Sequence, residues 1–408
     1  MSIDESNAPA YRWYILGLST LTNVLASAMP GMCMPVLFDE ISADLSLSLV
    51  EVGVIWGISS LPGIVTALLG GAIGDRFGPR RVLILACLMV GLTGALRGLA
   101  IDFLTLMLTM FLFGMFTPFI TLNSFKTCGL WFSRRQMGLA SGVLSMGMAL
   151  GFLLSSMLSA TVLSPLLGGW RSVLVLYGGI AALLTIPWAL TRPTPAAAGA
   201  DGAVVLRSFR SNLVSMARIR SIWFFGLALL GFNGAVQGAL GYLPLFLRGQ
   251  GWTPTAADGA LAAFHTVSMI FVIPIALISD RLGTRRGILI PAALMAAVGF
   301  GLLSVVEGML VWAAVLLAGL VRDGFMAVFM TAVLETEGVG PAYAGTALGL
   351  VMIFSGLGNL IAPPLGNSFA ATAPGLPFLF WAFMALVGLT GLILARSNQR
   401  QGPAPVLP

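Results

Sequence analysis

The chain has 408 residues, of which 58% are apolar and 9% are charged, and its mean hydropathy is +0.98. This composition excludes an ordinary soluble domain, in which about a quarter of the residues are charged. The formal charge of +6 would suit a nucleic-acid partner, but the basic residues lie between long apolar stretches, which argues against that role.

Apolar stretches follow one another along the chain, and each is long enough to cross a bilayer, which takes about 20 mostly apolar residues. The expected spans are residues 13–37, 51–73, 82–101, 104–129, 138–163, 172–190, 221–246, 256–278, 287–305, 309–333, 344–365 and 376–395. The alternation typical of membrane strands is missing. We therefore predict an all-α membrane protein with twelve transmembrane helices, the first of which is retained because it is too long for a signal peptide.

Basic residues gather on alternate connections between the predicted helices. Sixteen of the 21 Lys and Arg residues fall in the two terminal tails and the connections after even-numbered helices. Of the connections on the other side, only two contain a basic residue, Arg171 and Arg248. Because loops rich in Lys and Arg stay in the cytoplasm, the pattern predicts a multi-pass protein of the cell (inner) membrane with both termini cytoplasmic. It gives no reason to expect a nucleic-acid partner.

A polar interruption divides the chain into two parts. Residues 192–220 contain Pro193, Pro195 and five arginines, and they predict a cytoplasmic linker with a surface helix near 205–218. An N-terminal six-helix bundle, residues 1–191, precedes this linker. A C-terminal six-helix bundle with a short cytoplasmic tail, residues 221–408, follows it.

The two parts share local sequence patterns. The connections after helices 2 and 8 both read Asp-Arg-x-Gly-x-Arg-Arg, and their aspartates, Asp75 and Asp280, are 205 positions apart. Helices 5 and 11 both begin with a Gly-x-Ala-x-Gly segment, at 138–142 and 345–349. Correspondences at a near-constant offset indicate duplication. Tandem halves with a pseudo-two-fold axis along the membrane normal, and a substrate site between them near the midplane, are the architecture of one transporter class.

These segments resemble the major facilitator superfamily. Its helix 2–3 signature, roughly Gly-x-Leu-Ala-Asp-Arg-x-Gly-Arg-Lys/Arg, is met by residues 71–81, with Gly74 and Pro79 departing from it, and it recurs around Asp280. The resemblance implies alternating access, in which the halves rock about a central cavity and the two loops help to latch the cytoplasmic side. The gating residues expected on this basis are Asp75, Arg76, Arg80, Asp280, Arg281 and Arg285. A plain positive-inside anchor is the alternative role for these loops.

Arg322 and Asp323 lie near the middle of predicted helix 10, where charged side chains are costly and therefore candidates for function. The aligned residues of helix 4 are Thr117 and Pro118, so this pair is present in one half only. Adjacent helical residues differ by about 100°, so we expect the two side chains to point apart. The resemblance places helix 10 on the cavity. We expect Arg322 to bind an anionic solute and Asp323 to neutralise it or carry a proton; a structural ion pair is the alternative.

Other polar residues of the predicted spans extend this candidate site. Lys126 follows Asn123 by three residues, so the two share a helix face, although Lys126 can instead reach the headgroups. The single histidine, His265, is either a proton relay or a hydrogen-bonded core residue. The remaining solute-binding candidates, which interhelical hydrogen bonds would equally explain, are Asn23, Asn233, Gln237 and Tyr242.

The sequence predicts a secondary active transporter, a symporter or an antiporter, for a small organic or inorganic anion such as a monocarboxylate. The segment 335–345 and the Asn123–Lys126 spacing faintly resemble the cyanate, nitrate and monocarboxylate porter branches. Many proton-coupled exporters carry an arginine four residues before a helix 4 glycine, and here Met110 precedes Gly114. Proton-coupled export of amphipathic drugs or cations through Asp323 nevertheless stays open, as does a membrane sensor that binds without transport.

Catalytic groupings are missing from the sequence. It has one histidine, no Ser-His-Asp pattern, no nucleotide-binding P-loop and no clustered metal ligands. We therefore expect no enzyme activity, no cofactor and no metal. The expected partners are a small-molecule substrate, a proton if transport is proton-coupled, and the lipid bilayer, with the chain acting as a monomer.

Overall fold

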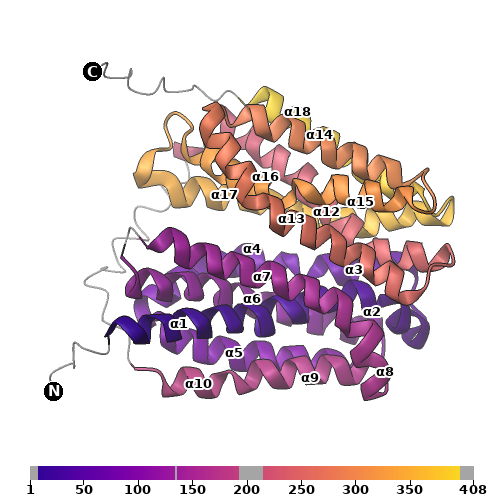
Figure 1. Cartoon of the computed structure of the whole chain (residues 1–408), viewed down its shortest axis with the longest axis horizontal. Coiled ribbons are helices and arrows are strands. Elements are labelled where there is room, and N and C mark those ends of the chain that lie inside the picture. The colour runs from indigo at the N-terminus through magenta and orange to yellow at the C-terminus, as the bar shows by residue number, and fades with distance from the viewer. Residues whose placement is uncertain (1–7, 134–135, 193–214, 396–408) are drawn as a thin grey trace.

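The computed structural model describes residues 8–133, 136–192 and 215–395, which contain helices and connections and no strand (Figure 1). Within these ranges, twelve helices are long and apolar enough to cross a membrane. The expectation of an all-α protein with twelve transmembrane helices is therefore confirmed. The surface helix expected near 205–218 falls almost wholly outside the described residues.

The first half contains spans 1 to 6, several of them built from two or three helical segments. They are α1 (Ala8–Thr22), the π-helical η1 (Asn23–Ala28) and α2 (Met29–Leu45); α3 (Leu49–Ile58) and α4 (Ser60–Phe77); α5 (Pro79–Leu96) and η2 (Arg97–Leu99); α6 (Phe103–Trp131); α7 (Met137–Leu158), the π-helical η3 (Ser159–Leu163) and α8 (Ser164–Leu167); and α9 (Trp170–Leu183) and α10 (Thr185–Leu190).

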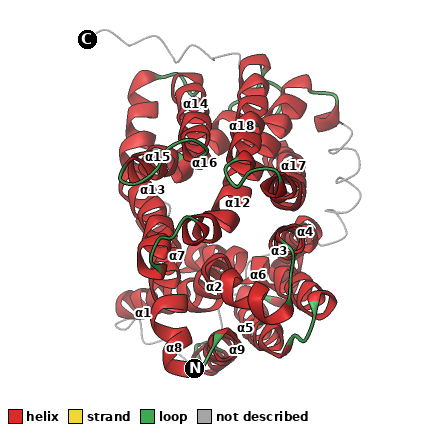
Figure 2. Ribbon diagram, turned by 90° about the vertical axis from the view of Figure 1, so that its right-hand side faces the viewer, coloured by secondary structure: helices red, strands yellow, loops and turns green. Residues whose placement is uncertain are grey.

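The second half contains spans 7 to 12. They are α12 (Arg220–Gly249); α13 (Pro254–Leu282); α14 (Arg286–Leu303); α15 (Leu310–Leu320) and α16 (Arg322–Leu334); α17 (Gly340–Ser368), followed by η4 (Phe369–Ala371); and α18 (Leu376–Leu394). Figure 2 shows the helices of the two halves as two groups that meet along α2, α3 and α7 on one side and α12, α13 and α17 on the other.

Polar residues in the short connections start several of the helices. Ser48 and Glu51 form a capping box at the start of α3, and Asp102 forms one with Thr105 at the start of α6. Thr253 accepts a hydrogen bond from the Ala256 N–H at the start of α13. Such caps satisfy backbone donors that the first helical turn leaves without partners.

Equivalent glycines make equivalent contacts in the two halves. A Cβ placed on Gly114 of α6 would lie 2.7 Å from the carbonyl carbon of Ser59, and one on Gly319 of α15 would lie 2.7 Å from the Phe264 carbonyl oxygen. Both the glycines and the residues they touch are 205 positions apart. The close packing of spans 2 and 4 is thus repeated by spans 8 and 10, which supports the duplication read from the sequence.

The bundle has two distinct ends. The end where α1 starts and α18 finishes is called the terminal end. The opposite end, which contains the connections 46–48 and 250–253, is called the distal end (Figure 1). Among the described residues, the hydrogen bonds and ion pairs that join the halves lie from the middle of the bundle toward the distal end. They are Trp56 Nε1 to the Gln237 carbonyl at 2.7 Å, Asn367 Nδ2 to the Leu49 carbonyl at 2.7 Å, and Arg248 Nη1 to Asp39 Oδ2 at 3.6 Å.

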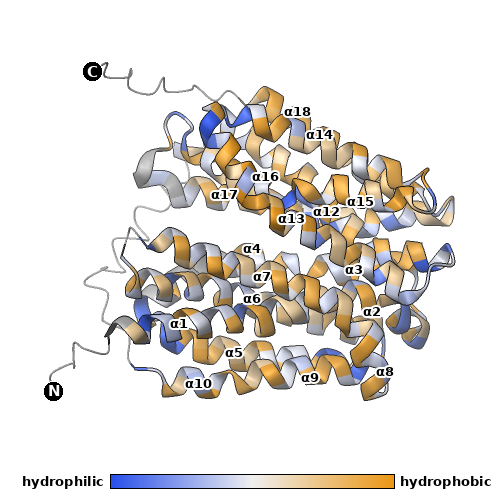
Figure 3. Ribbon diagram, in the orientation of Figure 1, coloured by the Kyte–Doolittle hydropathy of each residue, from blue (hydrophilic) through white to orange (hydrophobic). Residues whose placement is uncertain are grey.

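Apolar residues predominate along the spans, as the orange colour of the ribbon in Figure 3 shows. Val65, Leu85 and Ile273 are each more than half exposed in the isolated chain. A lipid bilayer accommodates such an apolar surface without a hydrophobic penalty, whereas its contact with water would be unfavourable. The cysteines Cys33, Cys87 and Cys128 are buried and free.

Candidate solute-binding site

The tenth span is interrupted in its middle. Helix α15 ends at Leu320 and α16 begins at Arg322, with Val321 between them at φ −96° and ψ −11°. The Asp323 N–H donates to Ser268 Oγ of α13 at 3.0 Å. A helix N-terminus therefore lies at mid-span, and its donors and dipole favour negative charge. Discontinuous helices of this kind bind anionic groups in other transporters.

Arg322 and Asp323 pair with each other at this break. Arg322 Nη1 lies 2.9 Å from Asp323 Oδ1, and the two side chains are 22% and 28% exposed. The expectation that they point apart is wrong, because the interrupted helix and the long arginine side chain allow the guanidinium to turn back to its neighbour. The pair is accessible and neutral overall when both groups are charged, so Arg322 could bind an anion only by giving up part of its bond to Asp323.

Aromatic groups surround this pair from both halves. The Arg322 guanidinium carbon lies 5.5 Å from the ring centre of Phe152 on α7, and the His265 ring lies 5.3 Å from the same ring. His265 is 1% exposed, and neither of its ring nitrogens has a hydrogen-bond partner among the described residues. Three predicted residues, Arg322, Asp323 and His265, are thus brought together where the halves meet.

Two members of this cluster were not predicted from the sequence. Ser268 lies three residues after His265, a spacing that places both on one helix face and that could have indicated it. Phe152 is one of 25 phenylalanines, and no local pattern distinguishes it. Together the cluster presents a guanidinium fork, a helix N-terminus, an imidazole and an aromatic face, which suits a planar anion with an apolar part.

The amides of helices 1 and 7 have partners of their own. Asn233 Nδ2 donates to Ser355 Oγ of α17 at 2.6 Å. Gln237 is half-buried, and its main-chain carbonyl accepts the hydrogen bond from Trp56. Asn23 is fully buried at the start of η1, and its Nδ2 donates to the Ser19 carbonyl at 2.9 Å. These contacts give the side-chain amide of Asn233 an interhelical role and that of Asn23 an intrahelical role in this conformation, whereas Gln237 joins the halves through its main chain.

Asn123 and Lys126 lie against α4 within the first half. Asn123 Nδ2 donates to the Phe119 carbonyl at 2.8 Å. A Cβ added to Gly74 would collide with the Asn123 amide oxygen and lie 3.4 Å from Lys126 Nζ, so both side chains face this glycine. The shared face predicted for them is present, but these contacts do not connect them to Arg322.

Tyr242 belongs to an aromatic cluster inside the second half. It is 4% exposed, and its hydroxyl donates to the Pro374 carbonyl at 3.1 Å. The rings of Phe246, Phe378 and Trp381 all have centres within 5.9 Å of its own. These contacts give Tyr242 a packing role, and we leave it out of the proposed site.

The expected gating arginine of the first half binds within its own half. Arg80 donates to the Ala189 carbonyl at 2.6 Å and to Thr191 Oγ1 at 3.0 Å, both at the end of span 6. Arg76 lies over the Phe77 ring at 5.4 Å. The side chain of Asp75 lies outside the described residues.

The corresponding loop of the second half is also tied to its own half. Arg285 pairs with Asp280 at 2.6 Å and with Glu335 at 2.9 Å, while Arg281 is exposed. The hydrogen bonds that Arg285 donates to Glu335, and then to Asp280, hold the pKa of its guanidinium above its usual value. Both loops therefore brace helix ends at the terminal end without a described bond between the halves.

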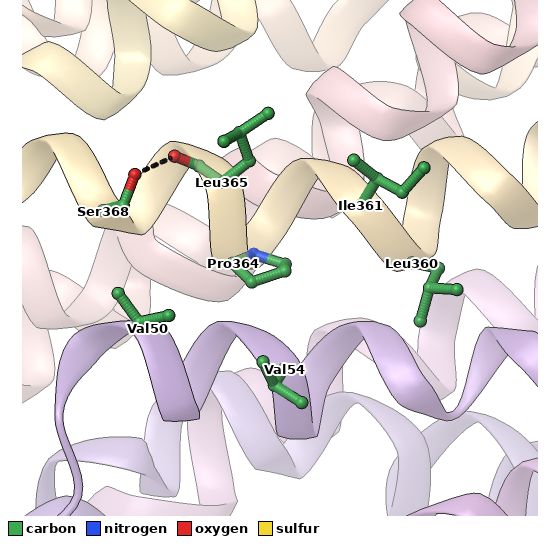
Figure 4. A pocket seen from close by; sticks show the side chains of 7 residues that line it. All are labelled: Val50, Val54, Leu360, Ile361, Pro364, Leu365 and Ser368. Carbon is green, nitrogen blue, oxygen red and sulfur yellow. Dashed lines mark hydrogen bonds between the residues drawn. The ribbon is translucent and has the colours of Figure 1, made fainter.

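A groove of about 480 Å³ lies elsewhere, between α3 and α17 (Figure 4). Its lining is apolar apart from Ser368, whose hydroxyl donates to the Leu365 carbonyl at 2.7 Å. Val50, Ile361 and Leu365 are 40–48% exposed on the outside of the bundle. This groove would face acyl chains, and it offers no group for an anion.

Residues 16–363 match the profile of the Major Facilitator Superfamily. The chain belongs to this superfamily. As a major facilitator protein it is a multi-pass membrane transporter of small solutes, and its resemblance to the family is confirmed over most of its length.

Two relatives of this major facilitator protein have similar lengths. A probable nitrate/nitrite antiporter of Thermus thermophilus is 27% identical over 93% of this chain and 90% of its own. The 3-(3-hydroxy-phenyl)propionate transporter of Escherichia coli (strain K12) is 26% identical over 89% of each chain.

Solved structures share the fold of the chain. A D-xylose–proton symporter superposes with a TM-score of 0.77 at 14% identity, covering 95% of this chain and 98% of that one. A bacterial homologue of the human lysosomal transporter Spinster, in an inward-facing conformation, gives a TM-score of 0.69 at 17% identity, covering 94% and 95%.

Proposed function

We propose that this protein is a secondary active transporter that moves a small carboxylate, such as a monocarboxylate, by alternating access. The observation that carries the proposal is the Arg322–Asp323 pair at the interruption of span 10, beside Phe152 of the opposite half. An accessible arginine at a mid-span helix N-terminus is a site for an anion. The carboxylate displaces Asp323 from Arg322 and accepts two parallel hydrogen bonds from the guanidinium.

The position of the site explains how binding can drive movement. Arg322 and His265 belong to the second half and Phe152 to the first, so a solute held among them touches both halves. Its contacts differ between conformations in which the halves are closer or further apart, and this difference in contact energy shifts their equilibrium. His265 contributes a ring nitrogen to the solute or receives a co-transported proton.

We further propose that the terminal end is cytoplasmic, with both termini inside. This proposal is supported by the excess of basic residues in the two tails and in the connections after even-numbered helices. The two bundles, 1–191 and 221–408, then move relative to each other, and the linker 192–220 connects them. In the present conformation the distal, outward end is joined, and the loops at Arg80 and Arg285 are free of the opposite half among the described residues. These loops would latch the cytoplasmic end when it closes.

The two relatives support an anionic solute. One is named for nitrate and nitrite, and the other for an aromatic propionate. A carboxylate with an aromatic or apolar part fits this chain better than nitrate, because Phe152 lies within cation–π distance of Arg322 and offers an apolar face beside the charge.

Uptake into proteoliposomes tests the proposal. Purified protein is assayed with radiolabelled 3-(3-hydroxyphenyl)propionate, benzoate and nitrate, and with tetraphenylphosphonium as a cation. We expect saturable carboxylate uptake above empty vesicles and a raised melting temperature with the same compounds, since a ligand at 100 times its Kd stabilises by about 2.7 kcal/mol. Arg171→Gln, a change at an exposed arginine of the distal end, is the matched control for substitutions of Arg322.

Other outcomes of this assay would contradict the proposal in distinct ways. Efflux of tetraphenylphosphonium that Asp323→Asn abolishes, with no carboxylate flux, would show a cation exporter. A melting shift with carboxylates but no flux above empty vesicles would show a sensor that binds without transport. Nitrate uptake in the absence of carboxylate uptake would show an inorganic-anion carrier.

A further inference from the structure

A second charged cluster, with a buried acid at its centre, lies at the distal end, away from the site at Arg322. Asp258, in the second turn of α13, is fully buried, and its Oδ1 accepts a hydrogen bond from Arg248 Nη2 at 2.7 Å. Its Oδ2 and the Arg248 Nε have no partner among the described residues. A buried carboxylate with one free oxygen is costly as an anion and can hold a proton on that oxygen.

The arginine of this cluster is shared between the halves. Arg248 is the last basic residue of α12, in the second half, and its Nη1 lies 3.6 Å from Asp39 Oδ2 of α2, in the first half. Its side chain is 10% exposed, whereas that of Asp39 is 57% exposed. The Arg248 guanidinium therefore has two partners. Asp258 belongs to the same half and stays beside it, whereas Asp39 belongs to the other half and separates from it if the distal end opens.

Two carboxylates pair with this one cation, and a third acts on Asp258. Asp39 and Glu40 of α2 both act electrostatically on Asp258, and Arg248 is the cation that opposes them. Glu40 also accepts a hydrogen bond from Ser164 Oγ at the start of α8, at 2.5 Å. When all are ionised the cluster carries a net charge of −2. Closure of the distal end brings the two carboxylates of the first half toward Asp258, and their repulsion disfavours the ionised form of this buried acid.

We propose that Asp258 is a proton-binding site that couples closure of the distal end to uptake of one proton. The proton comes from water on the distal side and binds Oδ2 as the end closes. Neutral Asp258 then leaves the charge of Arg248 to Asp39, which strengthens the contact between the halves. Loss of the proton returns Arg248 to Asp258 and weakens that contact, so the end opens.

Linkage sets the size and sign of the expected effect. If closure binds one proton, acid favours the closed distal end, and the ratio of closed to open protein changes by up to about tenfold per pH unit. The effect requires no solute. It is independent of the proposed binding of carboxylates at Arg322, and either proposal can fail alone.

The test measures the distal end directly by double electron–electron resonance. Spin labels are placed at Ala43→Cys and Thr372→Cys, exposed positions on opposite halves, in full-length protein whose three native cysteines are replaced by alanine, in nanodiscs from pH 5 to pH 9 without solute. We expect the short-distance population to grow as the pH falls. In Asp258→Asn, which mimics the protonated acid, the short distance should dominate at every pH.

Matched variants separate a proton site from a general surface effect. Asp44→Asn removes an exposed distal acid that pairs with Arg171, and it should keep the pH dependence. Glu40→Gln removes one repelling charge and should move the transition to lower pH. A wild type insensitive to pH, or Asp258→Asn with the wild-type response, would overturn the proposal. If Asp258→Asn does not fold, an unshifted transition in Glu40→Gln overturns it as well.

Discussion

Spans 4 and 10 occupy equivalent places in the two halves, yet one is continuous and the other is interrupted. Helix α6 runs without a break for 29 residues, although it contains Pro118. Span 10 has no proline and is interrupted at Val321, directly before Arg322. A proline alone therefore does not decide where a spanning helix breaks, and the neighbouring helix has to be considered as well.

The residues that face these two positions show why they differ. Gly63 of α4 faces Pro118, with a Cβ there 3.8 Å from the proline ring, and the equivalent Ser268 of α13 faces Asp323. Pro118 has no N–H to donate and Gly63 has no side chain to accept one. In the second half both groups are present and form the hydrogen bond. The two copies share a common scaffold, and the differences at these two facing positions coincide with the interrupted, charged site in one copy.

The largest expected effect comes from removing the charge that distinguishes span 10. Arg322→Gln should lower carboxylate uptake about ten- to a hundredfold, because hydrogen bonds to charged groups contribute about 1.5–3 kcal/mol. Radiolabel uptake into proteoliposomes measures it, with Arg171→Gln as the control. Arg322→Lys should restore part of the flux, since it keeps the charge but loses the bidentate fork. Unchanged uptake in Arg322→Gln would show that the charge difference between spans 4 and 10 has no part in carboxylate transport.

The hydrogen bond across spans 8 and 10 is tested by Ser268→Ala. The change leaves the Asp323 N–H without its acceptor, which should lower the free energy of unfolding by about 1–3 kcal/mol. Ser156→Ala is the control, because Ser156 only donates to the Phe152 carbonyl of its own helix. Thermal unfolding of both variants gives the comparison. Equal melting temperatures would mean that the interruption of span 10 does not depend on Ser268.

Span 2 is also interrupted, at Ser59, whereas its equivalent α13 is continuous. Trp56 lies just before this break and donates a hydrogen bond to the other half. Trp56→Phe removes that hydrogen bond and should shift the ratio of closed to open distal end about two- to tenfold toward open, from a bond of about 0.5–1.5 kcal/mol. Trp381→Phe removes the same kind of bond, to the Ala362 carbonyl at 3.0 Å, inside one half. It should lower stability without moving the labels at positions 43 and 372.

The smallest expected effect concerns the starts of the two helices. Asp102 caps α6, whereas Val321, the N-cap residue of α16, forms no side-chain cap. Hydrogen bonds from the Thr105 side chain, and then from its N–H, lower the pKa of Asp102. Its contribution is therefore present above the unfolded pKa of about 3.9 and is lost as the pH falls through the lower folded value. The melting temperatures of wild type and Asp102→Asn should differ slightly at pH 7 and converge below pH 3; a constant difference would contradict this.

Sequence patterns predicted the scaffold but only part of the site. Arg322, Asp323 and His265 were found because ionisable residues are rare in apolar spans, and the structure brings the three together. The same argument applies to Asp258, which falls inside the predicted span 256–278 but is not among the predicted site residues. Tyr242 was a candidate because it is polar on helix 7, but its hydrogen-bond acceptor and two of its ring partners come from residues 374–381, which no local pattern connects to it.

The twelve spans, their grouping in two related halves and the basic connections followed from the sequence alone, because apolar length, repeated segments and charge are local properties. Only the tertiary structure showed the interruption of span 10, the pairing of Arg322 with Asp323 beside Phe152, and the Arg248 bridge between Asp39 and Asp258. Each of these depends on which side chain a neighbouring helix presents, as with Ser268 and Asp323, 55 residues apart. Such contacts depend on how the helices pack, and the residue periodicity within one helix does not specify which helix packs beside it.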